Sequence, residues 1–160
     1  IKKVLPTYLI ALTTGSSAAA FAECVDCCER KLGIDRKLVD FGLPLGIVIF
    51  MPNFALWLVL FGGACAEYAG TVLTPADLLA VAVIGVFLAV AAPPVPGGAI
   101  TCYTILLMQM NMPMEMLAVA AAVNVVVDFT GTAGHMLANQ IELLQCAADL
   151  GMLDRKILEN

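Results

Sequence analysis

The residues best suited to chemistry lie in one long apolar stretch, residues 116–138, whose single ionised side chain is Asp128. On a helix, Asn124 lies one turn before Asp128 and His135 two turns after it, so the three share one face. A carboxylate in an apolar environment is costly unless a cation or hydrogen-bond donors satisfy it. The stretch therefore predicts a cation or proton site on a membrane helix, with a protonated structural carboxyl as the alternative.

Other reactive side chains are few. His135 has an intrinsic pKa near neutrality and could serve a proton route, but we favour a packed or capping histidine. Cys24, Cys27 and Cys28 share a helical face, and without a second cysteine pair at metal-binding spacing they indicate helix packing. No nucleophile–base pair, metal cluster or phosphate-binding loop is visible in the sequence, so we predict that the chain is not an enzyme.

The composition is that of an integral membrane protein. Of 160 residues, 61% are hydrophobic and only 13% are charged, and the mean hydropathy is +0.95. Soluble domains are about 25% charged, so too few polar side chains remain here to cover a globular surface. Apolar runs recur along the whole chain, which a signal peptide would not explain. We expect a multi-pass protein of the cell (inner) membrane, in contact with the lipid bilayer.

Basic residues occur in three clusters that suggest an orientation. The tendency of cytoplasmic segments to be positive predicts that the N-terminus, the loop 30–37 and the C-terminus all face the cytoplasm. The net charge of −5 argues against nucleic-acid binding. The clusters are Lys2 and Lys3; Arg30, Lys31, Arg36 and Lys37; and Arg155 and Lys156.

Breaks in the apolar runs predict the topology. Residues 4–21 are broken by a polar segment at 13–17 and flanked by basic residues on both sides, so we predict a re-entrant helical hairpin over residues 1–34. A single spanning helix with a Gly-Ser kink is the alternative. Pro52 interrupts residues 41–66, which are long enough to span, and predicts a broken transmembrane helix within residues 35–70 rather than a harmless kink.

The second half repeats this plan. A Pro- and Gly-rich segment at 93–98 separates two short apolar helices and predicts a second re-entrant hairpin over residues 71–112. A last transmembrane helix and cytoplasmic tail follow over residues 113–160. Helix-start patterns place an N-cap at Asp35, another at Thr74, and Pro113 near the first position of the last helix.

The chain is therefore expected to be an all-α integral membrane protein in the order hairpin, broken helix, hairpin, helix, as in transporters with inverted repeats. It resembles the C-terminal transport core of the dicarboxylate/amino acid:cation symporter family, the glutamate transporter homologues. Four motifs in the same order carry the resemblance: residues 13–19, 41–46 and 95–99, and the pattern Asn124-x-x-x-Asp128-x-Thr130-Gly131-Thr132.

The resemblance implies one transport domain that moves like an elevator against an N-terminal scaffold. The scaffold trimerises in the family and is absent from this sequence, so a homotrimer is expected only if a scaffold is present. No cofactor is implied, but a coupling ion is, either Na⁺ or H⁺. The implied cation ligands are Gly46, Asn124 and Asp128, with Na⁺ a candidate at Asp128. The implied substrate contacts are Ser16, Ser17, Pro96, Gly97, Gly98 and Asn124.

Departures from the family pattern suggest the substrate. The family's Asn-Met-Asp-Gly-Thr motif falls on residues 50–54, where only Met51 is retained. Its upstream acid and Arg-Thr pair fall on Leu117, Ala120 and Ala121. We therefore expect symport of a small monocarboxylate or a neutral, apolar amino acid, coupled to Na⁺ or H⁺ through Asp128. The alternatives are a degenerate or truncated non-transporting relative, or a structural or channel-like membrane module.

Overall fold

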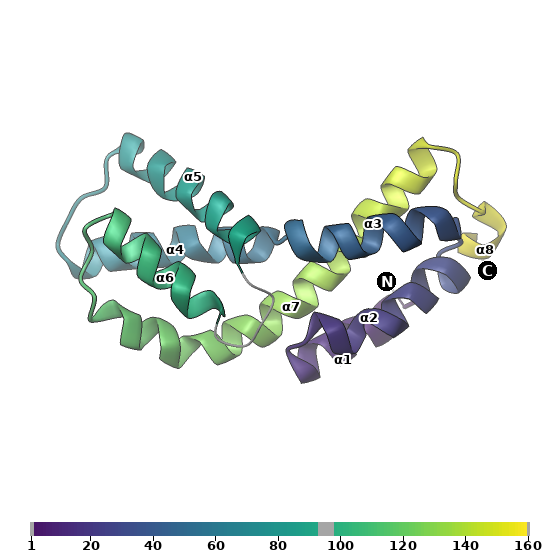
Figure 1. The fold of residues 1–160 in the computed structure, drawn as a ribbon, viewed down its shortest axis with the longest axis horizontal. Helices are drawn as coiled ribbons and strands as arrows, with labels where there is room; N and C mark the ends of the chain where they lie inside the picture. Colours follow the sequence, from purple (N-terminus) through teal and green to yellow (C-terminus); the bar gives the residue numbers. More distant parts are fainter. Residues whose placement is uncertain (1, 93–97, 160) are drawn as a thin grey trace. The chain divides into compact units, whose positions relative to one another are not determined.

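The computed structural model describes residues 2–92 and 98–159, and Figure 1 shows their helices. Within these two ranges there is no β-strand, only an isolated antiparallel bridge between Ile34 and Leu153. The all-α prediction is confirmed. The chain forms two compact units, Ile1–Phe50 with Asp128–Asn160 and Met51–Val127, which we describe separately.

The helices of the two units are as follows. The first unit contains α1 (Leu5–Thr14), α2 (Ser17–Asp26), the π-helical turn η1 (Cys27–Lys31), α3 (Arg36–Ile49), the second part of α7 (Met116–Asp149) and α8 (Arg155–Glu159). The second unit contains α4 (Pro52–Tyr68), α5 (Pro75–Ala91), α6 (Gly98–Gln109) and the first part of α7.

The chain reverses direction between α1 and α2. Gly15 ends α1 with a left-handed φ of 59°, and its N–H donates to the Ala11 carbonyl at 2.9 Å. Ser16 then caps α2 by accepting a hydrogen bond from the Ala19 N–H at 3.3 Å. The two helices pack side by side (Figure 1). A single kinked helix over residues 4–21 is therefore excluded, while insertion of this pair as a re-entrant hairpin stays a prediction.

One lysine joins three distant segments of the first unit. The Lys3 ammonium donates to the carbonyl oxygens of Lys31 at 2.9 Å and of Ile157 and Leu158 at 2.8 Å. A second link runs from the Asp154 N–H to the Gly33 carbonyl at 2.8 Å. The N-terminus, the loop 30–37 and the C-terminal segment thus lie at one end of the unit. The side of the membrane on which this end lies stays a prediction.

The helix over residues 36–68 is completely broken. Phe50 (φ −102°, ψ 84°) and Met51 (φ −117°, ψ 62°) leave the helical conformation, and α4 begins at Pro52. Because proline has no N–H, its position at the start of α4 leaves no donor unpaired there. The alternative of a harmless proline kink is excluded. By length and composition, the stretches Arg36–Tyr68 and Met116–Asp149 could each cross a membrane.

Two of the three predicted helix starts are confirmed. Asp35 accepts from the Lys37 N–H at 2.8 Å, and Thr74 forms a reciprocal capping box with Asp77. The predicted start at Pro113 is wrong, because α7 begins at Met116. The carbonyls of residues 113–115 each accept a hydrogen bond from the N–H three residues ahead, at 3.0–3.2 Å. These bonds form turns before the regular α-helical hydrogen bonds begin. Met112 precedes Pro113 and has no side-chain oxygen that could cap a helix there.

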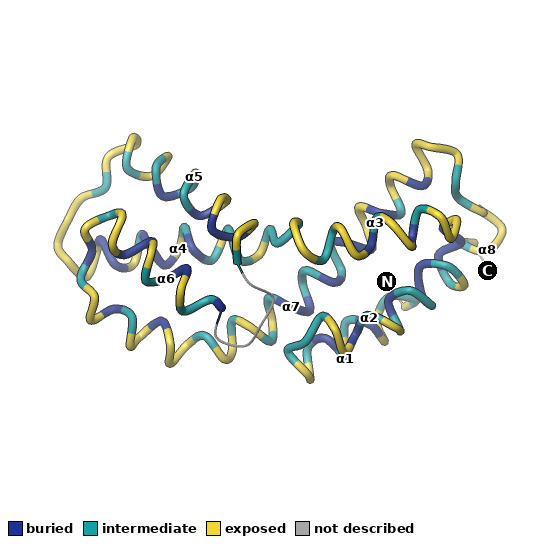
Figure 2. Tube along the Cα trace, in the orientation of Figure 1, coloured by how far each residue is buried: buried dark blue, intermediate teal, exposed yellow. Residues whose placement is uncertain are grey.

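Each unit has its own apolar core. In the first, Cys24, Cys27 and Cys28 are completely buried, which agrees with their packing role. There the buried Gln140 amide of α7 donates to the Thr7 hydroxyl of α1 at 3.2 Å. In the second, Tyr103 is completely buried between α4, α6 and α7. Figure 2 shows exposed residues on most helices, and many of them are large and apolar, as a lipid-facing surface requires.

We expect Lys3→Met to loosen the C-terminal segment. A hydrogen bond from a charged donor contributes about 2 kcal/mol, so losing these three together should raise the amide exchange rates of residues 154–158 by at least about 30-fold. Hydrogen exchange measured on the purified protein checks this. Lys2→Met is the matched control, because Lys2 is exposed. Equal exchange rates in the two variants would contradict the role of Lys3.

Candidate ion and substrate site

Asp128 has the chemistry expected of an ion site. It lies in the middle of α7, within the first unit, and its side chain is exposed. Within residues 2–92 and 98–159, no basic side chain or hydrogen-bond donor pairs with its carboxylate. In a membrane helix an unpaired carboxylate is strongly disfavoured. The carboxylate therefore requires a proton or a bound cation in that environment.

Asn139, which the sequence did not single out, connects α7 to the break after α3. Only 5% of this residue is exposed, and its Nδ2 amide donates to the Phe50 carbonyl at 3.3 Å and to the His135 carbonyl at 2.9 Å. Phe50 is the C-cap of α3, so its carbonyl has no continuing helix to pair with. Asn139 lies eleven residues, about three turns, after Asp128. This helical spacing from Asp128 is the sequence signal that could have identified Asn139.

Gly46 permits this contact. A Cβ at Gly46 would overlap the Asn139 Oδ1 atom, so only glycine lets α3 and α7 approach so closely. The Gly46 carbonyl also accepts the last hydrogen bond of α3, from the Phe50 N–H at 2.8 Å. The structure thus gives Gly46 a packing role, and its predicted role as a cation ligand stays a prediction.

His135 is packed and does not cap a helix end. It lies in the interior of α7, its side chain is partly buried, and its Nδ1 atom has no hydrogen-bond partner among the residues that the structure describes. Its backbone carbonyl accepts the hydrogen bond from Asn139. Of the two roles that we favoured from the sequence, the packed histidine agrees with the structure.

The predicted substrate contacts belong to both units. Ser16 and Ser17 lie at the start of α2, where the Ser16 oxygen already caps the helix and its hydroxyl hydrogen can still donate. Gly98 is the buried first residue of α6. Pro96 and Gly97 lie outside the described residues. The joint role of these residues with Asn124 stays a prediction.

Asn124 is paired within the second unit. Its Oδ1 atom accepts from the Tyr103 hydroxyl at 2.8 Å, and the Tyr103 oxygen accepts from the Trp57 indole N–H at 2.9 Å. Tyr103 and Trp57 were not identified from the sequence, where an aromatic residue in an apolar run indicates only packing. They lie on α6 and α4, and their hydrogen bonds depend on the tertiary packing of these helices.

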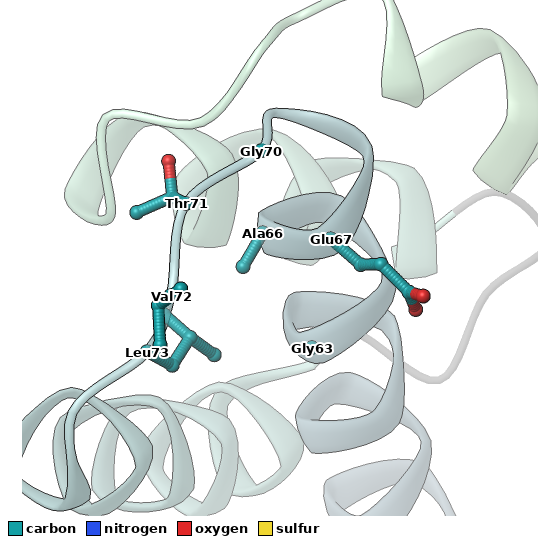
Figure 3. Close-up of a pocket in the computed structure, with 7 residues that line it drawn as sticks. All are labelled: Gly63, Ala66, Glu67, Gly70, Thr71, Val72 and Leu73. Atoms are coloured by element: carbon teal, nitrogen blue, oxygen red, sulfur yellow. The ribbon is translucent and has the colours of Figure 1, made fainter.

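A surface hollow in the second unit contains none of the predicted residues. It measures about 380 Å³, lies at the end of α4 and has mostly apolar walls. Figure 3 shows the Glu67 carboxylate pointing away from Thr71 and Leu73. The lining residues are Gly63, Ala66, Glu67, Gly70, Thr71, Val72 and Leu73.

Comparison with known proteins identifies the family. Residues 1–141 match the model of the sodium:dicarboxylate symporter family, so the chain belongs to this family and the resemblance seen in the sequence is confirmed. Since the family consists of transporters, the prediction that the chain is not an enzyme is also confirmed.

Individual relatives are similar over most of this chain. Excitatory amino acid transporter 2 of Homo sapiens is 26% identical over 136 residues, which are 85% of this chain and 24% of the relative. An excitatory amino acid transporter of Caenorhabditis elegans is 24% identical over 139 residues, 87% of this chain and 28% of the relative. Neutral amino acid transporter A of Bos taurus is 26% identical over 129 residues, 81% of this chain and 24% of the relative. The chain spans about a quarter of the length of these relatives.

We expect Gly46→Ala to destabilise the protein by about 1–3 kcal/mol, because the new methyl group must displace Asn139. Gly63→Ala is the control: it is also a helical glycine, but a Cβ there meets nothing within 4 Å, so helix propensity alone should stabilise by about 0.5–1 kcal/mol. Thermal unfolding in detergent measures both.

The double variant Gly46→Ala/Asn139→Ala separates the clash from a general effect on α3. Removing the Asn139 amide removes the overlap, so the two changes should together destabilise less than the sum of the single changes. Strict additivity in the same unfolding measurement would contradict the contact.

Proposed function

We propose that this chain is the transport domain of a secondary active symporter, which carries a small organic solute together with Na⁺ or H⁺ bound at Asp128. The observation that carries the proposal is the Asp128 carboxylate, which has no partner among the described residues although it lies in the apolar α7. A bound cation or proton would neutralise this carboxylate, so its charge would be compensated only while the ion is bound. Membership of the sodium:dicarboxylate symporter family supports a coupled ion.

The proposed substrate is a small monocarboxylate or a neutral, apolar amino acid. Between Lys37 and Arg155 the sequence contains no lysine or arginine, so a second carboxylate on the substrate would have no cationic partner from this region. The family resemblance assigns one substrate carboxylate to Ser16, Ser17 and Asn124 and to backbone N–H groups at the two predicted hairpin tips. A neutral amino acid transporter among the relatives is compatible with this choice.

The proposed architecture keeps the four segments as one transport domain: residues 1–34, 35–70, 71–112 and 113–160. The return of α2 to the Lys3 end of α1 supports a re-entrant first hairpin. We propose a multi-pass protein of the cell (inner) membrane with both termini in the cytoplasm. Its domain would move by an elevator-type displacement, and a homotrimer would form only through an N-terminal scaffold.

A second candidate is a degenerate relative that does not transport. It is favoured by the loss of family ligand side chains at Phe50 and Pro52 and at the aligned positions Leu117, Ala120 and Ala121. Ion binding separates the two candidates, because a protein without a working site gains no stability from Na⁺, protons or solutes.

We expect Na⁺, at about 100 times its dissociation constant, to stabilise the wild-type protein by about 2.7 kcal/mol relative to K⁺. If H⁺ is the coupling ion, lower pH should stabilise it instead. Asp128→Asn should abolish the effect, because the neutral amide cannot compensate the charge of an ion. Glu142→Gln is the matched control, since Glu142 is an exposed acid on the same helix.

Thermal unfolding in detergent, in Na⁺ and K⁺ and at two pH values, measures these effects. Ion stabilisation that persists unchanged in Asp128→Asn would remove Asp128 from the coupling site. A folded wild-type protein that responds to neither ion nor pH would favour the degenerate relative.

A further inference from the structure

A chain of two hydrogen bonds within the second unit ends on Asn124. The Trp57 indole N–H of α4 donates to the Tyr103 hydroxyl oxygen of α6 at 2.9 Å, and that hydroxyl donates to the Asn124 Oδ1 of α7 at 2.8 Å. Three helices that are distant in the sequence are thus joined through one phenol. Among these three side chains, the sequence identified only Asn124 as a site residue.

The chemistry of the three groups sets the direction of the chain. An indole N–H can only donate, so the Tyr103 oxygen accepts from Trp57 and its single hydrogen remains for Asn124. The Asn124 oxygen therefore faces Tyr103, and the two N–H donors of its amide remain available. These donors make no hydrogen bond with any residue in the ranges that the structure describes.

Tyr103 is held firmly enough to orient another side chain. It is completely buried, and its ring packs against Phe61 at 5.2 Å between centroids and edge-on against Phe54 at 6.1 Å. Aromatic contacts of this kind restrict a ring beyond simple burial. A side chain that is itself fixed can preorganise the polar group that it bonds.

We propose that Tyr103 and Trp57 are positioning residues, which hold the Asn124 amide so that it offers N–H donors to a carboxylate of the substrate. This inference rests on the proposed function, in which Asn124 contacts the substrate. In this role the N–H donors of Asn124 serve the substrate, and the proposed function places the coupling ion at Asp128.

The test uses the purified protein and its single tryptophan, Trp57. Tyr103→Phe keeps the packed ring and removes the hydroxyl, so the indole loses its acceptor and Trp57 fluorescence should shift without any ligand present. With acetate, L-lactate, L-alanine and L-serine as probes in saturating Na⁺, the half-saturating concentration should rise about 5- to 10-fold, as expected for one hydrogen bond. The half-saturating concentration of Na⁺ without probe should not change.

Two further variants guard against a general loss of structure. Tyr68→Phe is the control, because Tyr68 is 63% exposed at the end of α4 and should behave as wild type. Trp57→Phe removes the indole N–H that donates to the Tyr103 oxygen and should weaken probe binding in the same direction. It also provides the test, by thermal stabilisation, if Tyr103→Phe does not fold.

The outcomes separate the two proposals. A wild-type protein that binds neither Na⁺ nor any probe overturns the proposed function and this inference with it. A wild-type protein that binds both, with an unchanged probe half-saturation in Tyr103→Phe, overturns only the positioning role. Equal weakening of Na⁺ and probe binding would also overturn the positioning role, because it indicates a structural defect. A Trp57 fluorescence that does not respond to loss of the hydroxyl would overturn it as well.

Discussion

The broken helix leaves a carbonyl at Phe50 without a helical partner, and the packing of the first unit depends on how that group is satisfied. An unpaired backbone carbonyl is expensive in an apolar environment because no water replaces the lost hydrogen bond. Asn139 provides the donor from α7. This explains why Gly46 is a glycine, since any side chain there would occupy the position of the Asn139 amide. The break after α3, the Asn139 amide and the glycine at position 46 therefore depend on one another.

The same constraint organises the polar side chains of α7. Three of its amides each bond a different segment within their own unit: Asn124 bonds α6, Asn139 bonds the end of α3, and Gln140 bonds α1. Asp128 differs, because no described residue partners its carboxylate. Amides that bond to other segments stabilise the fold, whereas a carboxylate without an internal partner is suited to an exchangeable ion.

Membership of the sodium:dicarboxylate symporter family accounts for the order of the helices but not for the chemistry of this site. Several positions where the resemblance expects polar ligands carry Phe50, Pro52 and Leu117 instead. Tyr103 and Trp57 add hydrogen bonds around the remaining Asn124. The proposed substrate carries a single carboxylate, because the sequence between Lys37 and Arg155 has no lysine or arginine to pair with a second one.

Much of the fold was determined by the sequence alone. Local sequence patterns predict the helix starts at Asp35 and Thr74, the reversal at Gly15 and the break before Pro52. Each of these features depends only on residues within one turn of the chain. The start of α7 was missed because the proline signal at Pro113 competes with turns that only the folded backbone reveals. The apolar setting of Asp128 was equally visible from composition. By contrast, the pairings of Asn139 with Phe50 and of Asn124 with Tyr103 were decided by the tertiary structure. They join residues 89 and 21 positions apart, and no periodicity within a single helix specifies which distant group an amide will meet.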